Sequence, residues 1–350
     1  MKNEKLLEKS LQLMAIELQQ RSVYLVVIES TLFAIIFVCT VVGNLMIMVV
    51  IYKNKSLQTV PSCFVLSLAV SDLTMALFSE PFCFVVLAVS KWPFGFAMCQ
   101  FNGYLVLSVV CASIQTMAWT AVNRYYRVVK TSQYGRVFTA RILKFILASI
   151  WIIALLCPCP YFLAGNKFIF IPAKFFCFQH VNSKLFTAFL LIVFVGFPSC
   201  VIFFCYFQIF RTVRNHNRDL YQSNSRVNVE EIKITRTLFV IVVMFMLCWT
   251  PILVVDLIDT FKGKWSLNRP IYTTYSFLGV ISSMVNPLCY GIMNPQFRKG
   301  YFKVFTRLFC YKRVSRISQN EMNLSNVTGE VSTQTKKIKP KIHSVLVLKK

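Results

Sequence analysis

Oxygen-bearing side chains interrupt several of the most apolar stretches of this 350-residue sequence. Asp72 lies in LSLAVSDL, Ser113 in CASIQ and Asn286 in SMVNPL, each inside a run of hydrophobic residues. Carboxylate, hydroxyl and amide oxygens are the ligands that a hard cation such as Na⁺ prefers. A buried hydrogen-bond network would use the same groups. The residue types therefore leave two interpretations open, a sodium site and a structural network.

A second polar cluster, NRYYR at residues 123–127, follows a long apolar run that ends at Trp119. An arginine beside two tyrosines is typical of a helix end at a membrane surface, where Arg124 extends its guanidinium toward water. A functional role for Arg124 is the alternative interpretation. The choice between a membrane-surface arginine and a functional one depends on the rest of the sequence.

The apolar stretches lack the residues that hydrolytic or metal-dependent catalysis requires. The three histidines, His180, His216 and His343, all lie outside them, and the sequence contains no GxSxG nucleophile motif. We therefore predict no enzyme activity, and no cofactor apart from an allosteric sodium ion.

The apolar stretches are the elements that must position these polar groups. Hydrophobic residues make up 56% of the chain and charged residues 15%, whereas about 25% of a typical soluble domain is charged. A helix needs about 20 apolar residues to cross a bilayer, and each span must be helical because lipid offers no partner for open backbone groups. The chain is therefore predicted to be all-α, a seven-transmembrane helix bundle. The seven runs are 23–52, 61–90, 96–123, 142–163, 185–210, 234–260 and 270–293.

Basic residues indicate the orientation of this bundle. Most of the 38 Lys and Arg residues lie in or beside the segments 53–60, 124–141 and 211–233 and in the C-terminal tail, and short loops rich in Lys and Arg stay on the cytoplasmic side. We expect the N-terminal tail, 1–22, to be extracellular and a disordered tail, 311–350, to be cytoplasmic. The positive charge fits contact with anionic membrane lipids, and nothing further indicates nucleic-acid binding.

Short motifs in these runs occur in an order that resembles the rhodopsin-like (class A) G-protein-coupled receptors over about residues 23–310. The motifs are GN at 43–44, LAVSD at 68–72, NRY at 123–125, Trp151, Pro198 with Tyr206, CWTP at 248–251 and NPLCY at 286–290. Within that family the chain is similar to melatonin-type receptors, on the basis of CQFNGYL at 99–105, AVNRYYR at 121–127 and YGIMNPQFRKGY at 290–301. The resemblance implies a plasma-membrane receptor that binds an extracellular ligand and activates a heterotrimeric G protein.

On this resemblance, the cytoplasmic ends of the spans carry the residues that couple to the G protein. The family uses an arginine at the place of Arg124 to hold the resting state and then to receive a G-protein helix. Glu231 stands where relatives carry the acid that pairs with this arginine. Because Asn123 replaces the acidic neighbour of most relatives, we expect Arg124 to depend more on Glu231 and the receptor to show partial basal activity. The expected coupling residues are Arg124, Tyr125, Tyr206, Glu231 and Tyr290.

The resemblance also implies a ligand pocket between the outer parts of the third, fifth, sixth and seventh spans. Val106 stands where amine receptors carry an aspartate, and Phe194 stands where melatonin-type receptors carry a histidine. We therefore expect a neutral, partly aromatic, melatonin-like small molecule as the ligand, and a weak response to melatonin itself. Asp256 and Glu80 are acidic candidates near the outside, and a structural ion pair is the alternative for each. The expected pocket residues are Val106, Leu107, Gln179, Phe194, Trp249, Asp256 and Tyr275.

Cysteine positions add two expectations from the family. Cys99 and Cys177 both fall on the oxidising side and match the family's disulfide, with Cys157 and Cys159 as alternative partners. At the other side, residues 295–309 predict a short amphipathic eighth helix on the inner leaflet. Cys310 follows this helix directly and is either palmitoylated or a free thiol.

A polytopic membrane transporter is the alternative function for seven apolar helices. Transporters are commonly built from inverted repeats with helices broken at mid-membrane, and the sequence displays neither feature. The ordered receptor motifs therefore favour a receptor.

Overall fold

The computed structural model describes residues 2–216 and 226–306. The chain divides into two units, Met1–Tyr301 and Phe302–Lys350. The first unit holds the whole helix bundle. In the second unit, the described residues 302–306 are helical.

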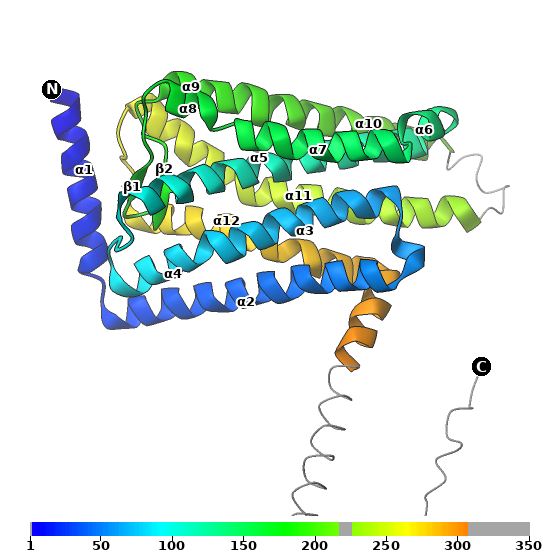
Figure 1. The fold of residues 1–350 in the computed structure, drawn as a ribbon, viewed down its shortest axis with the longest axis horizontal. Helices are drawn as coiled ribbons and strands as arrows, with labels where there is room; N and C mark the ends of the chain where they lie inside the picture. Colours follow the sequence, from blue (N-terminus) through cyan, green and yellow to red (C-terminus); the bar gives the residue numbers. More distant parts are fainter. Residues whose placement is uncertain (1, 217–225, 307–350) are drawn as a thin grey trace, which may run out of the picture. The chain divides into compact units, whose positions relative to one another are not determined.

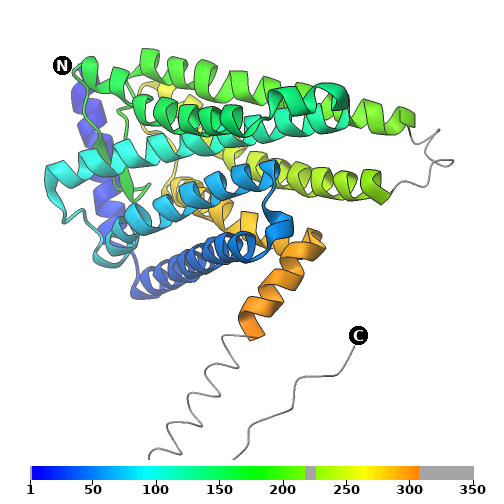
Figure 2. The same ribbon diagram turned by 45° about the vertical axis from the view of Figure 1, so that its right-hand side comes forward.

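Seven helical segments of the described chain are long and apolar enough to cross a membrane. They coincide with the seven predicted runs, which confirms the all-α seven-helix fold, and they run side by side as one bundle (Figures 1 and 2). The corresponding helices are α2 (Val23–Lys53), α3 with α4 (Val60–Phe78, Glu80–Val89), α5 (Gly95–Val128), α7 with α8 (Ala140–Leu156, Cys159–Leu163), α9 with α10 (Lys184–Phe189, Phe197–His216), α11 (Arg226–Lys262) and α12 (Arg269–Met293).

Helix α5 forms the centre of the bundle, because it packs against α3, α7, α10 and α11. Its buried face includes small residues such as Ala112 and Ala121, which let neighbouring helices approach closely. Large apolar side chains elsewhere, such as Phe145, Ile152 and Phe203, are exposed on the outside of the bundle. A surface of this kind is suited to lipid rather than water. Short connections include a 3₁₀ turn at Lys55–Leu57 and the helix α6 at Thr131–Val137.

Prolines interrupt the helical hydrogen bonding within three of the spans, because proline has no N–H to donate. Ser79 separates α3 from α4 just before Pro81, and Cys157 with Pro158 separates α7 from α8. Between α9 and α10, the segment Leu190–Gly196 is a π-helix. The break at Ser79 was not predicted. Two further prolines lie inside helices that continue past them, Pro251 in α11 and Pro287 in α12.

The N-terminal tail forms a helix, α1 (Lys2–Gln19), that lies across one end of the bundle (Figure 1). Its apolar residues Leu7, Leu11, Met14 and Leu18 follow a 4-3-4 spacing, which places them along one helical stripe. Leu7, Met14 and Leu18 are buried in the same core cluster as side chains of the bundle, and Leu11 packs against that cluster. The tail is therefore part of the folded unit, which the sequence alone did not predict.

Ion pairs attach the end of α1 to the bundle. Arg21 donates through Nη1 to the Glu29 carboxylate at 2.7 Å and through Nη2 to the backbone carbonyl of Leu87 at 2.5 Å and to Ser90 Oγ at 3.0 Å. Arg269 Nη2 donates to the same Glu29 carboxylate at 2.6 Å. Burial of the guanidinium lowers the pKa of Arg21, while Glu29 opposes that change. A single carboxylate thus joins the tail, α2 and α12.

The predicted amphipathic helix 295–309 is helical in its described part, residues 295–306. In the first unit, Phe297 is buried and its ring stacks on that of Tyr290, with centroids 5.0 Å apart. In the second unit, Phe302 is exposed. Residues 307–309, Cys310 and the tail 311–350 lie outside the described residues.

Candidate functional site

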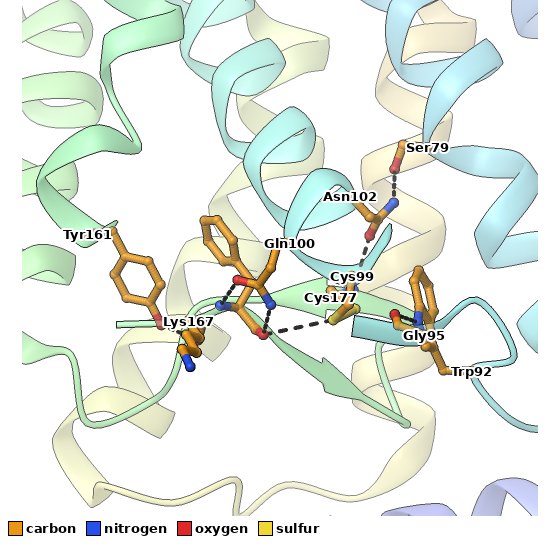
Figure 3. The surroundings of a disulfide bond; sticks show 10 residues. Ser79, Trp92, Gly95, Cys99, Gln100, Asn102, Tyr161, Lys167 and Cys177 are labelled. Atoms are coloured by element: carbon orange, nitrogen blue, oxygen red, sulfur yellow. Dashed lines mark hydrogen bonds between the residues drawn. A yellow bond between two sulfur atoms is a disulfide. The ribbon is translucent and has the colours of Figure 1, made fainter. Parts of the chain in front are cut away.

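A short β-hairpin closes the end of the bundle that α1 covers. Its strands, β1 (Ile169–Ile171) and β2 (Phe176–Phe178), pair in an antiparallel register that places Phe170 opposite Cys177. Cys177 forms a disulfide with Cys99 at the start of α5, with an S–S distance of 2.04 Å (Figure 3). The predicted bridge is confirmed. The alternative partners, Cys157 and Cys159, are free thiols.

Side chains of α5 hold this hairpin beside the disulfide (Figure 3). Gln100 donates through Nε2 to the carbonyl of Phe168 at 2.7 Å and accepts from the N–H of Phe168 at 2.9 Å. Asn102 accepts from the N–H of Cys177 at 3.1 Å and donates to Ser79 Oγ at 3.0 Å. The amide of Asn102 therefore connects the hairpin to the break between α3 and α4.

A cavity of ≈ 160 Å³ lies between the hairpin and the helices. Its wall is mainly apolar, and its volume is of the order that admits a molecule built on one or two rings. All seven predicted pocket residues line this cavity, although their part in ligand binding stays a prediction. They are Val106, Leu107, Gln179, Phe194, Trp249, Asp256 and Tyr275.

A buried lysine neutralises one acid of the cavity wall. Lys174, in the turn of the hairpin, is 2% exposed and donates through Nζ to Asp256 Oδ1 at 2.7 Å. The Tyr275 hydroxyl donates to the other oxygen of Asp256 at 3.0 Å. Lys174 also lies 4.1 Å from the centre of the Tyr275 ring, and its carbonyl accepts from Ser276 Oγ at 2.6 Å. Asp256 thus lines the cavity and also forms a structural ion pair, which are the two roles that the sequence left open.

Three other side chains of the cavity wall keep unused hydrogen-bonding atoms among the described residues. The unused atoms are the two carboxyl oxygens of Glu80, Oε1 of Gln179 and the indole Nε1 of Trp249. Gln179 uses its amide nitrogen to donate to Thr187 Oγ1 at 3.2 Å. The wall of this cavity is therefore apolar over most of its area, with a few open polar atoms.

A smaller cavity of ≈ 20 Å³ lies next to the first one. Asp72, Ser113 and Asn286 line it together, although Asp72 and Asn286 are 214 residues apart in the sequence. Asn286 donates through Nδ2 to Asp72 Oδ2 at 2.8 Å, and Ser113 Oγ is 2.9 Å from Ser71 Oγ. A space of this size is large enough for one water molecule or a single small ion. The carboxylate and hydroxyl oxygens around it fit a hard cation.

The indole of Trp249 borders both cavities, as do four of its neighbours. The shared lining residues are Met75, Val110, Phe245, Trp249 and Gly279. The Trp249 ring stacks on Phe245, with centroids 5.5 Å apart. A side chain that moves here changes the shape of both cavities.

At the opposite end of α5, Arg124 is 1% exposed and held by two partners. Its Nη1 donates to Glu231 Oε2 of α11 at 3.2 Å, and its Nη2 donates to Asn123 Oδ1 at 2.6 Å. Arg127 donates through Nε to the other oxygen of Glu231 at 3.0 Å. The buried guanidinium excludes a side chain that extends toward water, which would be exposed, and the coupling role of Arg124 stays a prediction.

The three tyrosines assigned to this end have different surroundings. Tyr206 and Tyr290 are buried, and the Tyr206 ring lies 5.1 Å from that of Phe239. The Tyr206 hydroxyl has no hydrogen-bond partner among the described residues. Tyr125 points toward α10, where its ring is 5.9 Å from Phe204. Arg124 and Glu231 are therefore brought together, while the Tyr125 ring contacts Phe204 of α10.

Sequence reasoning missed Lys174, Arg127 and Tyr134. Arg127 is one helical turn beyond Arg124, and its guanidinium lies 5.0 Å above the Tyr134 ring. The Tyr134 hydroxyl in turn accepts from Asn123 Nδ2 at 3.3 Å. The one available signal was the spacing of Arg124 and Arg127, which places both on the same side of a helix. No comparable signal marked Lys174. Among the described residues, no cluster of three or more His, Cys, Asp or Glu side chains is arranged to hold a metal ion.

Comparison with known sequences supports the class of protein that this fold and site define. The sequence model of the family described as "7 transmembrane receptor (rhodopsin family)" matches residues 43–290. The chain belongs to this family, and it is a G-protein-coupled receptor that binds an extracellular ligand. The transporter alternative is not favoured, and the family consists of membrane receptors rather than enzymes.

Individual relatives narrow the similarity further. The chain is 27% identical over 281 residues to "Melatonin receptor type 1B-B" of Danio rerio, covering 79% of this chain and 81% of that one. It is 27% identical over 302 residues to "Melatonin receptor type 1A" of Mus musculus, covering 84% and 85%. Among solved structures, squid rhodopsin is similar with a TM-score of 0.69 and 25% identity, over 81% of this chain and 87% of that one. The chain therefore resembles melatonin receptors within the rhodopsin family, as predicted.

Proposed function

We propose that the chain resides in the plasma membrane with its disulfide end outside, binds a small and mainly apolar ligand in the larger cavity, and activates a heterotrimeric G protein at the Arg124 end. The observation that carries this proposal is the ion pair of buried Arg124 with half-buried Glu231, which joins α5 to α11 at 3.2 Å. The same two helices line the ligand cavity at their other ends. A ligand that changes their packing in the cavity therefore acts on the ion pair.

The character of the cavity favours a neutral, partly aromatic ligand. Val106 offers no charge for an ammonium group, and the acid of Asp256 is already paired with Lys174 at 2.7 Å. The similarity to melatonin receptors makes an indole compound the first class to test. Phe194 stands where a hydrogen-bonding side chain is expected in those receptors, so the response to melatonin itself is weak.

The smaller cavity has a place in this proposal as an allosteric sodium site. Asp72 supplies the charge, while Ser113 and Asn286 supply further polar atoms around the same space. Trp249 lies between this cavity and the ligand cavity. A ligand that favours one position of this indole therefore competes with an ion that favours another.

The conformation described here is the resting one in this proposal. The guanidinium of Arg124 is occupied by Glu231 and Asn123, and it has to leave Glu231 to receive a G-protein helix. In this orientation the basic end of the bundle faces the cytoplasmic leaflet, where anionic lipid headgroups attract it.

The experiment is a ligand-panel screen, with indoleamines included, in cells that report cAMP and calcium. We expect at least one small apolar compound to evoke a response, and Arg124→Ala to abolish it while surface expression stays near normal. Lys91→Ala, an exposed change at the disulfide end, is the matched control and keeps the response. An unchanged response in Arg124→Ala would disprove the assigned role of this arginine.

A further inference from the structure

Glu80 is the least satisfied acid in the described chain. It is 2% exposed, it lines the larger cavity, and neither of its carboxyl oxygens has a hydrogen-bond partner among the described residues. The other buried acids of the described residues all have partners, since Glu29 binds Arg21, Asp72 accepts from Asn286 and Asp259 accepts from Tyr272.

An unpaired carboxyl group in such a place destabilises the ligand-free protein. Burying a polar group without a hydrogen bond is costly, and burying a charge without a partner is more so. Paired acids elsewhere in this bundle show that the fold has ways to satisfy a buried carboxylate. An unsatisfied one that faces an open cavity is therefore complementary to a group that arrives from outside.

The position of Glu80 in its own helix does not account for it. Glu80 is the first residue of α4, and an acid in the first turn interacts favourably with the helix dipole. That interaction leaves the carboxyl oxygens without hydrogen bonds, and it is available equally to an acid that faces outward. The break at Ser79 and the following Pro81 turn the start of α4, so that Glu80 and Cys83 both line the cavity.

Two other open atoms of the same wall complete a recognition pattern. Gln179 Oε1, beyond β2, is a second free acceptor, and Trp249 Nε1, on α11, is a free donor. The rest of the wall is built largely from side chains such as Val106, Phe194 and Leu190. Such a wall selects an apolar body that carries hydrogen-bond donors on more than one side.

We propose that Glu80 anchors the ligand by accepting a hydrogen bond from an N–H group on an otherwise apolar, ring-containing molecule. This inference rests on the proposed function and adds to it the residue and the chemical group that fix the ligand. The N–H belongs either to a neutral amide or indole or to a protonated amine. With a neutral ligand, Glu80 is protonated and donates its own O–H to an acceptor on the ligand. Both sources share the donor, and the probes below separate them.

The first test measures the melting temperature of the purified full-length receptor without ligand. We expect Glu80→Gln and Glu80→Leu to raise it by roughly 2–4 °C, because they remove an acid that has no partner. Glu29→Gln is the matched control, and it lowers the melting temperature because it breaks the pairs with Arg21 and Arg269. A decrease with both Glu80 variants would show that Glu80 is structural and would overturn the proposal.

The second test uses three indole probes on the same preparations. Tryptamine carries a protonated amine, N-acetyltryptamine carries neutral N–H groups, and N-acetyltryptamine methylated on both nitrogens carries no donor. We expect at least one donor-bearing probe to bind at least tenfold more tightly than the methylated one, and this preference to disappear in Glu80→Leu. Whichever probe, tryptamine or N-acetyltryptamine, loses more affinity in Glu80→Leu identifies the source of the N–H.

Equal affinity of the methylated and unmethylated probes for the unmodified receptor would overturn the proposal. So would an unchanged affinity of both donor-bearing probes in Glu80→Leu. These measurements contain no G protein. Their failure is therefore distinct from a failure of the coupling function, which the screen with Arg124→Ala tests separately.

Discussion

Arg124 and Glu231 form an ion pair across α5 and α11, with Nη1 and Oε2 3.2 Å apart, although 107 residues separate them in the sequence. Asn123, the neighbour of Arg124, accepts from the same guanidinium at 2.6 Å without adding a charge. Glu231 is therefore the acid that both Arg124 and Arg127 bind.

Glu231→Gln should raise basal activity. The substitution removes the charge that holds both Arg124 and Arg127, and a loss of about 1 kcal/mol shifts the ratio of the two states roughly fivefold toward the open one. Nucleotide exchange on a reconstituted G protein measures the effect without a ligand. Glu17→Gln, which removes an exposed carboxylate on α1, is the control and should leave exchange unchanged. Equal nucleotide exchange in both variants would contradict a role of the Arg124–Glu231 ion pair in holding the resting state.

Asp72→Asn should abolish an effect of sodium on ligand affinity. If Na⁺ occupies the ≈ 20 Å³ cavity in the resting state, added sodium lowers the affinity of an activating ligand, because each stabilises a different conformation. Ligand binding in sodium chloride, compared with binding in choline chloride at the same ionic strength, measures this effect. A sodium response that persists in the variant would support a purely structural network around Asp72.

Lys174 and Asp256 should behave as a coupled pair in thermal unfolding. Lys174→Met leaves the Asp256 carboxylate without its cation, and breaking a buried ion pair in this way costs about 3 kcal/mol or more. Asp256→Asn leaves the buried Lys174 unpaired and should also lower the melting temperature. The double variant should be less destabilised than the sum of the two single variants. Additive effects would mean that the pair contributes nothing as a pair.

Phe194→His should improve the response to melatonin. Phe194 lines the cavity with an aromatic face where melatonin-type receptors carry a histidine, and an unpaired polar group of a buried ligand costs about 1–3 kcal/mol, or roughly 5- to 150-fold in affinity. A dose–response curve for inhibition of cAMP measures the shift. Phe194→Leu is the control of similar polarity and should bring no gain. An equal gain in Phe194→His and Phe194→Leu would show that the pocket has been misinterpreted.

Hydropathy and motif order predicted the seven spans and the Cys99–Cys177 bridge, because each depends on local composition or on a single pair of positions. The meeting of Asp72 with Asn286 could be anticipated, since polar groups in a bundle avoid lipid and face one another. The position of helix α1 could not be predicted, because an amphipathic sequence shows which face of a helix is apolar but not which surface that face packs against. The partner of Lys174 depends on the path of a loop, which no periodic pattern records.

The π-helical segment Leu190–Gly196 has a consequence for how this receptor can evolve. A π-helix bonds each N–H to the carbonyl five residues back, so the segment holds one residue more than an α-helix would. Deleting a single residue there would restore the regular helix without shortening the span below the width of a bilayer. It would leave Thr187, the partner of Gln179, on nearly the same side of the helix, because the deleted residue is the extra one that the wider π turns hold. A one-codon deletion inside this segment is therefore compatible with an unchanged cavity wall, whereas the same deletion in an α-helical part of the span would turn that wall by about 100° and change the ligand preference.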